Sequence, residues 1–403
     1  MNTQSIPALA VMLITQALVV MAAFTAPVLG KRFTDSIGLP PELIGYYTSV
    51  VFAGAMLASL LSTPLIQRHG SVRVSQATLV LAAAGLVMLV FGAVAAAALS
   101  AILLGFAYGP GNPASSQLLA RTTPPHRRSM VFSLKQTAVP IGVTTAGVVL
   151  PYVTFVFGLE AALWLAAGTC LALAVAVQPW RGSLDKHRPE RVGRASLAGP
   201  FRLVFSKPAL RRLALVSGCL ASVQFSFSAI FVTFLQQQTG ASATEAGPIL
   251  SIAMSISVAL RVVLGAVADR FSGRAVLITM ALFMVAPAAV LAGLPDAPFA
   301  MVALMGLILG SASFSWNGVY LAEVAEAAPA DQVATATAGT MFFVFLGGFV
   351  GPGAVSTATA LAGSYSAGFI TMAAFAAAGT AALLLRPAGV RLKGETPMPR
   401  DRS

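Results

Sequence analysis

Charged residues are scarce in this chain: they make up 9% of its 403 residues, against about 25% in soluble domains. Apolar residues reach 57%, and a soluble protein of this composition would expose more apolar surface than soluble monomers do. The composition therefore excludes an ordinary soluble domain and predicts a protein that crosses a membrane many times.

Cysteine and histidine are equally scarce, which argues against several kinds of site. The two cysteines, Cys170 and Cys219, both fall inside apolar runs, so we expect them to pack in the interior without a disulfide or metal role. The three histidines fall in predicted loops. The sequence shows no nucleotide-binding loop, metal-ligand cluster or catalytic triad, and it indicates neither an enzyme nor a cofactor.

Long apolar runs are abundant instead, and about 20 helical residues suffice to cross a hydrocarbon core of about 30 Å. Six runs are predicted to span the membrane before a polar stretch, at 7–29, 43–66, 75–95, 97–119, 131–157 and 160–179. Six more follow it, at 213–235, 246–267, 275–294, 298–321, 335–361 and 366–385. We predict an all-α membrane protein with one six-helix bundle at 1–179, a basic linker at 180–212, a second bundle at 213–386 and a basic tail at 387–403.

Basic residues predict the orientation. Of the 25 lysines and arginines, 21 fall in the linker, the tail and the loops on one side, and only Lys31 and Arg32 fall on the other. Because basic loops stay in the cytoplasm, we expect a cytoplasmic (inner) membrane protein with both termini inside. This topology and contact with membrane lipids explain the net charge of +12 without nucleic-acid binding.

The remaining two basic residues, Lys135 and Arg261, lie within predicted spans, whereas all 13 acids fall in loops or near an interface. A cation at the bilayer centre costs at least about 2.5–3.5 kcal/mol. Two such cations without a carboxylate at their depth suggest that the missing anion is the substrate. We expect both to reach one cavity, although Lys135 is close enough to the end of its span to extend to the surface instead.

Other polar or aromatic residues in the spans are candidates for lining the same cavity. For each of them the alternative is interhelical hydrogen bonding or packing. They are Gln136, Asn112, Gln224, Trp316, Asn317 and Tyr320.

An internal repeat connects the two halves. The segment NPASSQLLARTTP at 112–124 aligns with NGVYLAEVAEAAP at 317–329, which places Asn112 on Asn317 and Pro124 on Pro329. Two six-helix halves related as parallel repeats are one of the ways in which secondary transporters are built.

One loop carries a recognisable motif. Gly265-Ala-Val-Ala-Asp269-Arg270-Phe-Ser-Gly273-Arg274, in which Ser272 is one inserted residue, resembles the G-x-x-x-D-R-x-G-R loop of the major facilitator superfamily. The first-half copy at 63–73 lacks the Gly and the Asp. With six-plus-six spans and basic loops on one side, the chain resembles a transporter of this superfamily over nearly its whole length.

The resemblance implies alternating access and a place at the interface of the halves for spans five and eight, which carry Lys135 and Arg261. The position of Arg261, four residues before Gly265, is similar to that of the span-eight arginine of monocarboxylate and oxalate transporters. The stretch SLKQTAVPIG at 133–142 resembles cyanate-transporter-like members.

A gating latch is the expected role of the motif loop. Asp269 can cap a neighbouring helix, and Arg270 and Arg274 can pair with carboxylates of the next span. The alternative is a basic loop that only fixes the topology. The residues of the predicted latch are Asp269, Arg270, Arg274, Gly265, Gly273, Glu323 and Glu326 in the second half, and Gln67, Arg68, Arg73 and Arg121 in the first.

We therefore predict a secondary active transporter, a symporter of a small organic anion such as a carboxylate, that acts as a monomer with protons as a possible coupling ion. The alternative is a proton-coupled efflux pump for amphipathic drugs. Such pumps commonly carry a buried acid and a G-x-x-x-G-P pattern in span five, and this sequence has neither.

Overall fold

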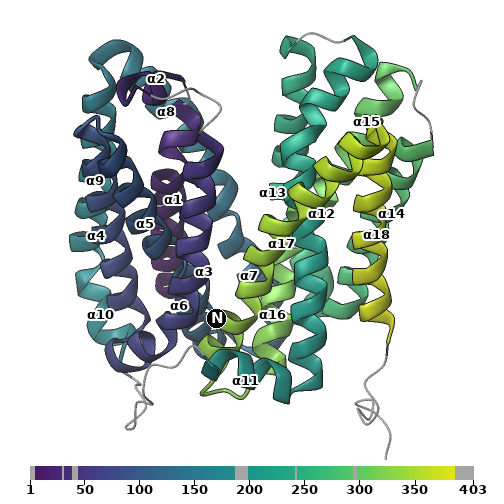
Figure 1. The fold of residues 1–403 in the computed structure, drawn as a ribbon. Helices are drawn as coiled ribbons and strands as arrows, with labels where there is room; N and C mark the ends of the chain where they lie inside the picture. Colours follow the sequence, from purple (N-terminus) through teal and green to yellow (C-terminus); the bar gives the residue numbers. More distant parts are fainter. Residues whose placement is uncertain are drawn as a thin grey trace, which may run out of the picture.

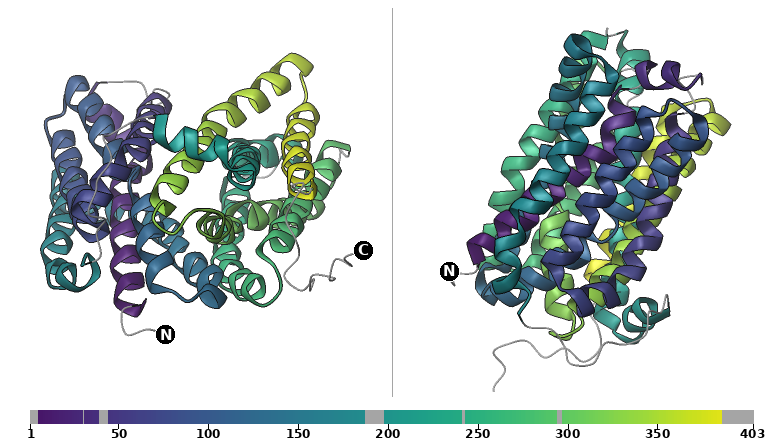
Figure 2. Two further views of the ribbon diagram at one scale, coloured as in Figure 1. Left: turned by 90° about the horizontal axis from the view of Figure 1, so that it is seen from below. Right: turned by 90° about the vertical axis from the view of Figure 1, so that its left-hand side faces the viewer.

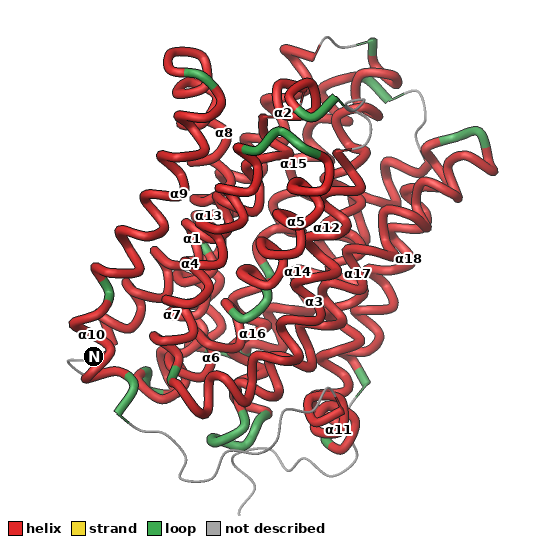
Figure 3. The backbone as a smooth tube through the Cα atoms, turned by 60° about the vertical axis from the view of Figure 1, so that its left-hand side comes forward, coloured by secondary structure: helices red, strands yellow, loops and turns green. Residues whose placement is uncertain are grey.

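The structure is a computed structural model that describes residues 5–29, 31–38, 44–186, 198–240, 243–293 and 297–385. The predicted tail at 387–403 and the middle of the predicted linker lie outside these residues. Every element in the described ranges is helical, as Figure 3 shows. Twelve helical segments of the described chain are long and apolar enough to cross a membrane, and each overlaps one predicted span. The predicted fold class is confirmed.

The helices form two bundles that stand side by side (Figure 1). The first bundle contains α1 (Ser5–Leu29), α2 (Lys31–Ser36), α3 (Ile44–His69), α4 (Ser71–Val90), α5 (Val94–Tyr108), α6 (Gly111–Thr122), the 3-10 helix η2 (Pro125–Arg127), α7 (Arg128–Gln136), α8 (Ala138–Phe157), α9 (Leu159–Ala176) and α10 (Gln178–Leu184). The chain continues through α11 (Ala198–Ser206), α12 (Pro208–Thr239), α13 (Ala243–Arg270), α14 (Gly273–Gly293), α15 (Phe299–Ser315), α16 (Asn317–Ala327), α17 (Val333–Ala362) and α18 (Tyr365–Leu384).

The connection between the bundles is more helical than the sequence suggested. Within the predicted linker at 180–212, α11 packs against α12 and α17, and α12 already begins at Pro208. Proline suits this position, because the first residue of a helix needs no N–H partner. Arg211 and Arg212, expected in the linker, therefore belong to the first turns of a membrane span.

Three predicted spans are interrupted by a break within the helix. The breaks fall between α5 and α6, at Thr137 between α7 and α8, and at Trp316 between α15 and α16. Pro110 lies in the first break, and Pro140 lies in the first turn of α8. A proline has no N–H to donate to the carbonyl four residues earlier, so Pro140 leaves the carbonyl of Gln136 without a helical partner.

The two bundles meet at the end of the molecule where α11 lies, which we call the linker end. There α7 packs against α13 and α16, and α17 packs against α3 and α6. Toward the opposite end the helices of the two bundles diverge, as Figure 1 shows, and the view from below in Figure 2 shows the two bundles side by side. The linker end is the closed end of the structure.

Buried apolar side chains reflect this closure. One core cluster lies entirely within the first bundle, whereas the larger cluster contains residues of both bundles. Midway along the helices, the ring of Phe52 lies 5.5 Å from that of Phe225 and 6.3 Å from that of Phe345, centroid to centroid. Packing between the bundles therefore reaches from the linker end to the middle of the helices.

Candidate functional site

Lys135 lies at the end of α7, next to the break at Thr137, with only 1% of its surface exposed. Its Nζ donates to Asn112 Oδ1 at 2.7 Å, to Gln16 Oε1 at 3.0 Å and to Gln136 Oε1 at 3.0 Å. The three donors of the ammonium group thus meet three neutral amide oxygens. The side chain points inward, so the alternative in which it extends to the surface does not hold in this conformation.

Gln16 of α1 is a member of this cluster that the sequence analysis missed. It is 3% exposed, and a Cβ on Gly111 would lie only 2.5 Å from its Oε1. The glycine at the start of α6 therefore leaves room for Gln16 to reach Lys135. The signal in the sequence was a glutamine within an otherwise apolar span, which has few polar partners available in a bilayer.

Arg261 lies in α13 of the second bundle and is 3% exposed. Its Nε donates to the backbone carbonyl of Phe314 at 2.8 Å, and its Nη2 donates to the same oxygen. Its Nη1 donates across the interface to the carbonyl of Gln136. The two accepting carbonyls lie next to two of the helix breaks. The carbonyl of Gln136 is available to Arg261 because Pro140 has no N–H with which to bond it within the helix.

Gln136 joins the two cations into one cluster. Its side chain accepts from Lys135, and its backbone carbonyl accepts from Arg261. Lys135 and Arg261 are close enough to act on each other electrostatically. Within the described part of the chain, no carboxylate contacts either cation. The structure thus brings together two buried cations from opposite bundles, in surroundings that contain only neutral oxygen partners.

A second polar group lies within the second bundle. Gln224 Oε1 of α12 accepts from Trp316 Nε1 and from Asn317 Nδ2, both at 3.1 Å. Asn112 Nδ2 instead donates to Met341 Sδ across the interface, at 3.6 Å. The repeat-related asparagines therefore have different partners: Asn112 belongs to the Lys135 cluster, and Asn317 belongs to the Gln224 group.

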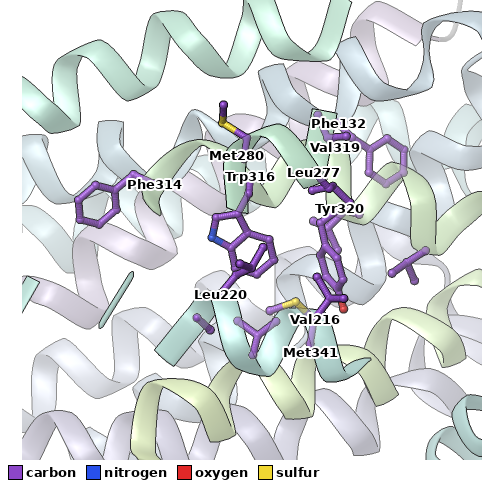
Figure 4. Close-up of a cluster of buried hydrophobic side chains, with 14 of the residues drawn as sticks. Phe132, Val216, Leu220, Leu277, Met280, Phe314, Trp316, Val319, Tyr320 and Met341 are labelled. Atoms are coloured by element: carbon purple, nitrogen blue, oxygen red, sulfur yellow. The ribbon is translucent and has the colours of Figure 1, made fainter. Parts of the chain in front are cut away.

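Trp316 and Tyr320 are buried in the interior of the protein in the present conformation. They are 0% and 1% exposed, and their ring centroids are 5.2 Å apart in an edge-to-face arrangement. Figure 4 shows both rings among apolar side chains that include Leu220 and Met280. For these two residues the packing alternative describes the present conformation.

Asp269 lies at the end of α13 and caps a helix of the other bundle. Its Oδ1 accepts from Ser129 N at 2.8 Å, and its Oδ2 accepts from Met130 N at 2.9 Å. These are backbone N–H groups in the first turn of α7, which have no partner within their own helix. A carboxylate at this positive end of the helix stabilises the contact between the bundles at the linker end.

Of the expected pairs between the motif loop and the glutamates, Arg274 lies close enough to Glu323 to act on it electrostatically, but its hydrogen bonds go elsewhere. Arg274 donates through Nε to Leu383 O at 2.8 Å and through Nη2 to Leu384 O at 3.1 Å, at the end of α18. Arg270 lies over the ring of Phe271. The hydrogen bonds of Arg274 go to backbone carbonyls because α18 ends beside the start of α14.

The two glutamates lie in different surroundings. The carboxylate of Glu323 lies against Gly273, where a Cβ would overlap it, and Glu326 is exposed. The absence of a side chain at Gly273 thus allows the start of α14 to lie close to Glu323 of α16.

The corresponding loop of the first half is organised by a residue that was assigned to the linker. Asp185, which is 4% exposed, accepts from Val72 N and Arg73 N at the start of α4, both at 3.1 Å. It acts electrostatically on Arg121 as well. Gln67 is half-buried, and Arg68 is exposed. The acid that is missing at Gln67 is therefore supplied from after α10, within the same bundle.

A neutral cap lies on the other side of the bundle interface. Gln117 Oε1 of α6 accepts from Ala334 N in the first turn of α17, at 3.0 Å. Together with the cap of α7 by Asp269, each bundle thus caps one helix of the other at the linker end. One cap is a charged carboxylate with two bonds, and the other is an amide with one bond.

We expect Asp269→Asn to weaken closure of the linker end without removing a substrate contact, because Asn keeps one acceptor and loses the charge. Loss of an N-terminal cap costs about 0.5–2 kcal/mol. Hydrogen exchange at the start of α7 should speed up about 2- to 30-fold, while ligand affinity changes by no more than a few-fold. Mass spectrometry of peptides covering α7 measures the exchange rate, and a binding titration measures the ligand affinity.

The matched control is Asp331→Asn, which removes an exposed carboxylate from the same end of the molecule. It should leave exchange in α7 unchanged. Loss of ligand binding in Asp269→Asn in proportion to loss of transport would contradict a latch role, since a latch acts on the equilibrium between conformations.

Comparisons with known proteins give the family. The model of the Major Facilitator Superfamily matches residues 11–352. An uncharacterized MFS-type transporter of Mycobacterium tuberculosis, strain ATCC 25618 / H37Rv, is 28% identical over 172 residues. That match covers 42% of this chain and only 37% of the relative's length.

Solved structures share the fold at low sequence identity. The E. coli fucose:proton symporter FucP is 16% identical, with a TM-score of 0.71 over 93% of this chain and 97% of that chain. A bacterial homologue of the iron transporter ferroportin in an outward-facing state is 14% identical, with a TM-score of 0.77 over 94% and 98%. The human organic anion transporter TETRAN is 18% identical, with a TM-score of 0.72 over 94% and 99%. The chain belongs to the Major Facilitator Superfamily and is an integral multi-pass membrane transporter, not an enzyme.

Proposed function

We propose that this transporter moves a small organic anion, in particular a carboxylate, across the cytoplasmic membrane by alternating access. The observation that carries the proposal is the pairing of Lys135 with Arg261. The two cations come from opposite bundles and lie buried at the interface, and their hydrogen-bond partners are neutral oxygens. A neutral oxygen offsets less of the cost of burying a cation than a carboxylate does. An anion bound between the bundles would supply the missing negative charge.

The contacts of Arg261 suggest how binding could couple to movement. Its bond to the Gln136 carbonyl joins the two bundles, and this bond must break when the linker end opens. A carboxylate can accept two parallel hydrogen bonds from a guanidinium, and it brings the negative charge that a backbone carbonyl lacks. An anion would therefore compete well with the carbonyls for Arg261 and favour the conformations in which it can reach the guanidinium.

The basic loops support the orientation in which the linker end and both termini are cytoplasmic. In that orientation the closed linker end corresponds to an outward-facing conformation. We propose symport by a monomer as the mode of transport, with protons as the coupling ion. The proton would be carried by the substrate's own carboxylate or by Lys135. Within the described residues, no buried acid lies beside the two cations that could carry it instead.

Ligand-dependent thermal stability of the purified protein in detergent tests this function. A ligand that binds only the folded state at 100 times its Kd adds about 2.7 kcal/mol of stability. Carboxylates should raise the unfolding temperature, inorganic anions should do so less, and cationic amphipathic drugs should not. Stabilisation by the drugs alone would reject the anion proposal and favour the efflux alternative.

A further inference from the structure

A cavity of about 460 Å³ opens beside α11 at the linker end, away from the Lys135 and Arg261 cluster. It lies between α11, α12, α17 and α18, and its wall is mostly apolar. Two arginines, Arg211 and Arg212, also line it. A cavity that combines two guanidinium groups with an apolar wall needs a ligand that carries both an anionic group and a hydrocarbon part.

The cavity runs from the end of the membrane spans into the bilayer. Pro208 is the first residue of α12, and Leu385 directly follows the last residue of α18, so both mark the rim. Leu215 lies seven residues beyond Pro208, about 10 Å along the helix. Phe343 lies ten residues beyond the start of α17 at Val333, about 15 Å deep. The arginines therefore lie near the headgroup level, and the deeper wall lies at the level of the acyl chains.

The arginines retain donors that no described group uses. The side chain of Arg211 is exposed and makes no hydrogen bond within the described residues. Arg212 donates through Nη1 to Leu385 O at 3.1 Å, and its buried Nε has no partner there. Arg274 and Glu323 are the charged neighbours that act on Arg212. The two arginines that line the cavity thus have a third arginine and one carboxylate as charged neighbours, so the charge at this rim is net positive.

Apolar surface is exposed at the same place. Phe205 of α11, Leu215 of α12 and Leu385 after α18 are 54%, 56% and 71% exposed. The chain's own tail is a poor occupant of this rim, because residues 386–403 carry five basic and two acidic side chains. Like charges would repel it from the arginines at this rim.

We infer that this cavity binds an anionic phospholipid, with the phosphate on Arg211 and Arg212 and one acyl chain along Leu215 and Phe343. Basic pockets between spans at the membrane surface are suited to anionic headgroups. The bound lipid would connect α11 to the second bundle. The site is separate from the proposed anion site, so either inference can fail without the other.

Native mass spectrometry of the full-length protein in detergent can count bound lipids during titration with phosphatidylglycerol. Phosphatidylcholine with the same acyl chains supplies the zwitterionic comparison, and glycerol 3-phosphate supplies the free anion. Wild type should bind phosphatidylglycerol more tightly than phosphatidylcholine and should bind glycerol 3-phosphate weakly. Arg211→Gln should weaken the first phosphatidylglycerol binding about five-fold, and Arg211→Glu should weaken it further.

Arg127→Gln is the matched control, because Arg127 is an exposed arginine at the same end, in the first bundle and outside the cavity. It should bind phosphatidylglycerol like wild type. Arg211 is exposed, so its variants should unfold at the wild-type temperature, which a thermal scan checks. Equal phosphatidylglycerol binding by wild type and both Arg211 variants would overturn the inference. Glycerol 3-phosphate binding as tightly as the lipid would instead show a site for a soluble phosphate.

Discussion

Arg261→Ala is expected to abolish anion transport and anion-dependent stabilisation while the protein still inserts into the membrane. The guanidinium bonds to both bundles, through the carbonyls of Phe314 and Gln136. Removing it deletes one of the two cations that would bind the substrate. Insertion should not suffer, because a buried cation opposes insertion and its removal relieves that cost.

Two further variants separate charge from geometry. Arg261→Lys keeps the charge but cannot form two parallel bonds to a carboxylate. A charge-assisted hydrogen bond contributes about 1.5–3 kcal/mol, so anion affinity should fall roughly 10- to 100-fold. Arg261→Met keeps much of the volume without the charge and should behave like Arg261→Ala toward anions. It controls for the effect of a cavity on folding.

Thermal unfolding of the four proteins in detergent, with and without a stabilising carboxylate, is the measurement. The baseline stability of the Ala and Met variants should drop, because two buried carbonyls lose a donor at about 1–3 kcal/mol each. The quantity to compare is therefore the increase in unfolding temperature that the anion causes in each protein. If Arg261→Ala shows the wild-type increase at the same anion concentration, the anion site is wrong and drug efflux becomes the better proposal.

The spans could be predicted from the sequence because each residue contributes to hydropathy independently of the fold. The role of Asp269 as a helix cap followed from its place at the end of a span. The breaks at Pro110 and before Pro140 could have been predicted from these two prolines, since each proline removes a helical hydrogen bond. The break at Trp316 carries no proline or glycine at its centre, and the predicted span at 298–321 runs through it.

The polar contacts between helices far apart in the sequence were harder to predict. Gln16 and Gln117 each find partners more than 100 residues away in the chain. A neutral polar residue in a span indicates that it needs a partner but does not indicate which one. Asp185 replaces the acid missing at Gln67, and it does so from a stretch where composition suggested only a linker. Hydrogen bonding of this kind depends on the packing of whole helices, which spacing along one helix does not determine.

Gly265 is a position where a single side chain should change which end of the transporter is closed. A Cβ added there would lie 2.8 Å from Met130 Cα and 2.8 Å from Ser133 Cβ, both on α7 of the other bundle. Carbon atoms in contact are normally about 3.5–4.0 Å apart, so α13 and α7 must separate. We expect Gly265→Leu to disfavour the closed linker end by about 1–3 kcal/mol, which shifts the equilibrium between conformations about 5- to 150-fold.

Spin labels on Arg127→Cys and Phe271→Cys would report this shift, because both positions are exposed and they lie on opposite bundles at the linker end. The native cysteines are buried, which keeps them from taking up the label. Gly168→Leu is the matched control: Gly168 is interior to helix α9 and a Cβ there meets nothing within 4 Å.

Gly265→Leu should add or enrich long distances between the labels, and Gly265→Ala should do so to a smaller extent. Gly168→Leu should leave the distribution unchanged. A folded Gly265→Leu protein with the wild-type distances would mean that α7 and α13 need not touch for the linker end to close. In that case the caps by Asp269 and Gln117, rather than close packing, would hold the bundles together at this end.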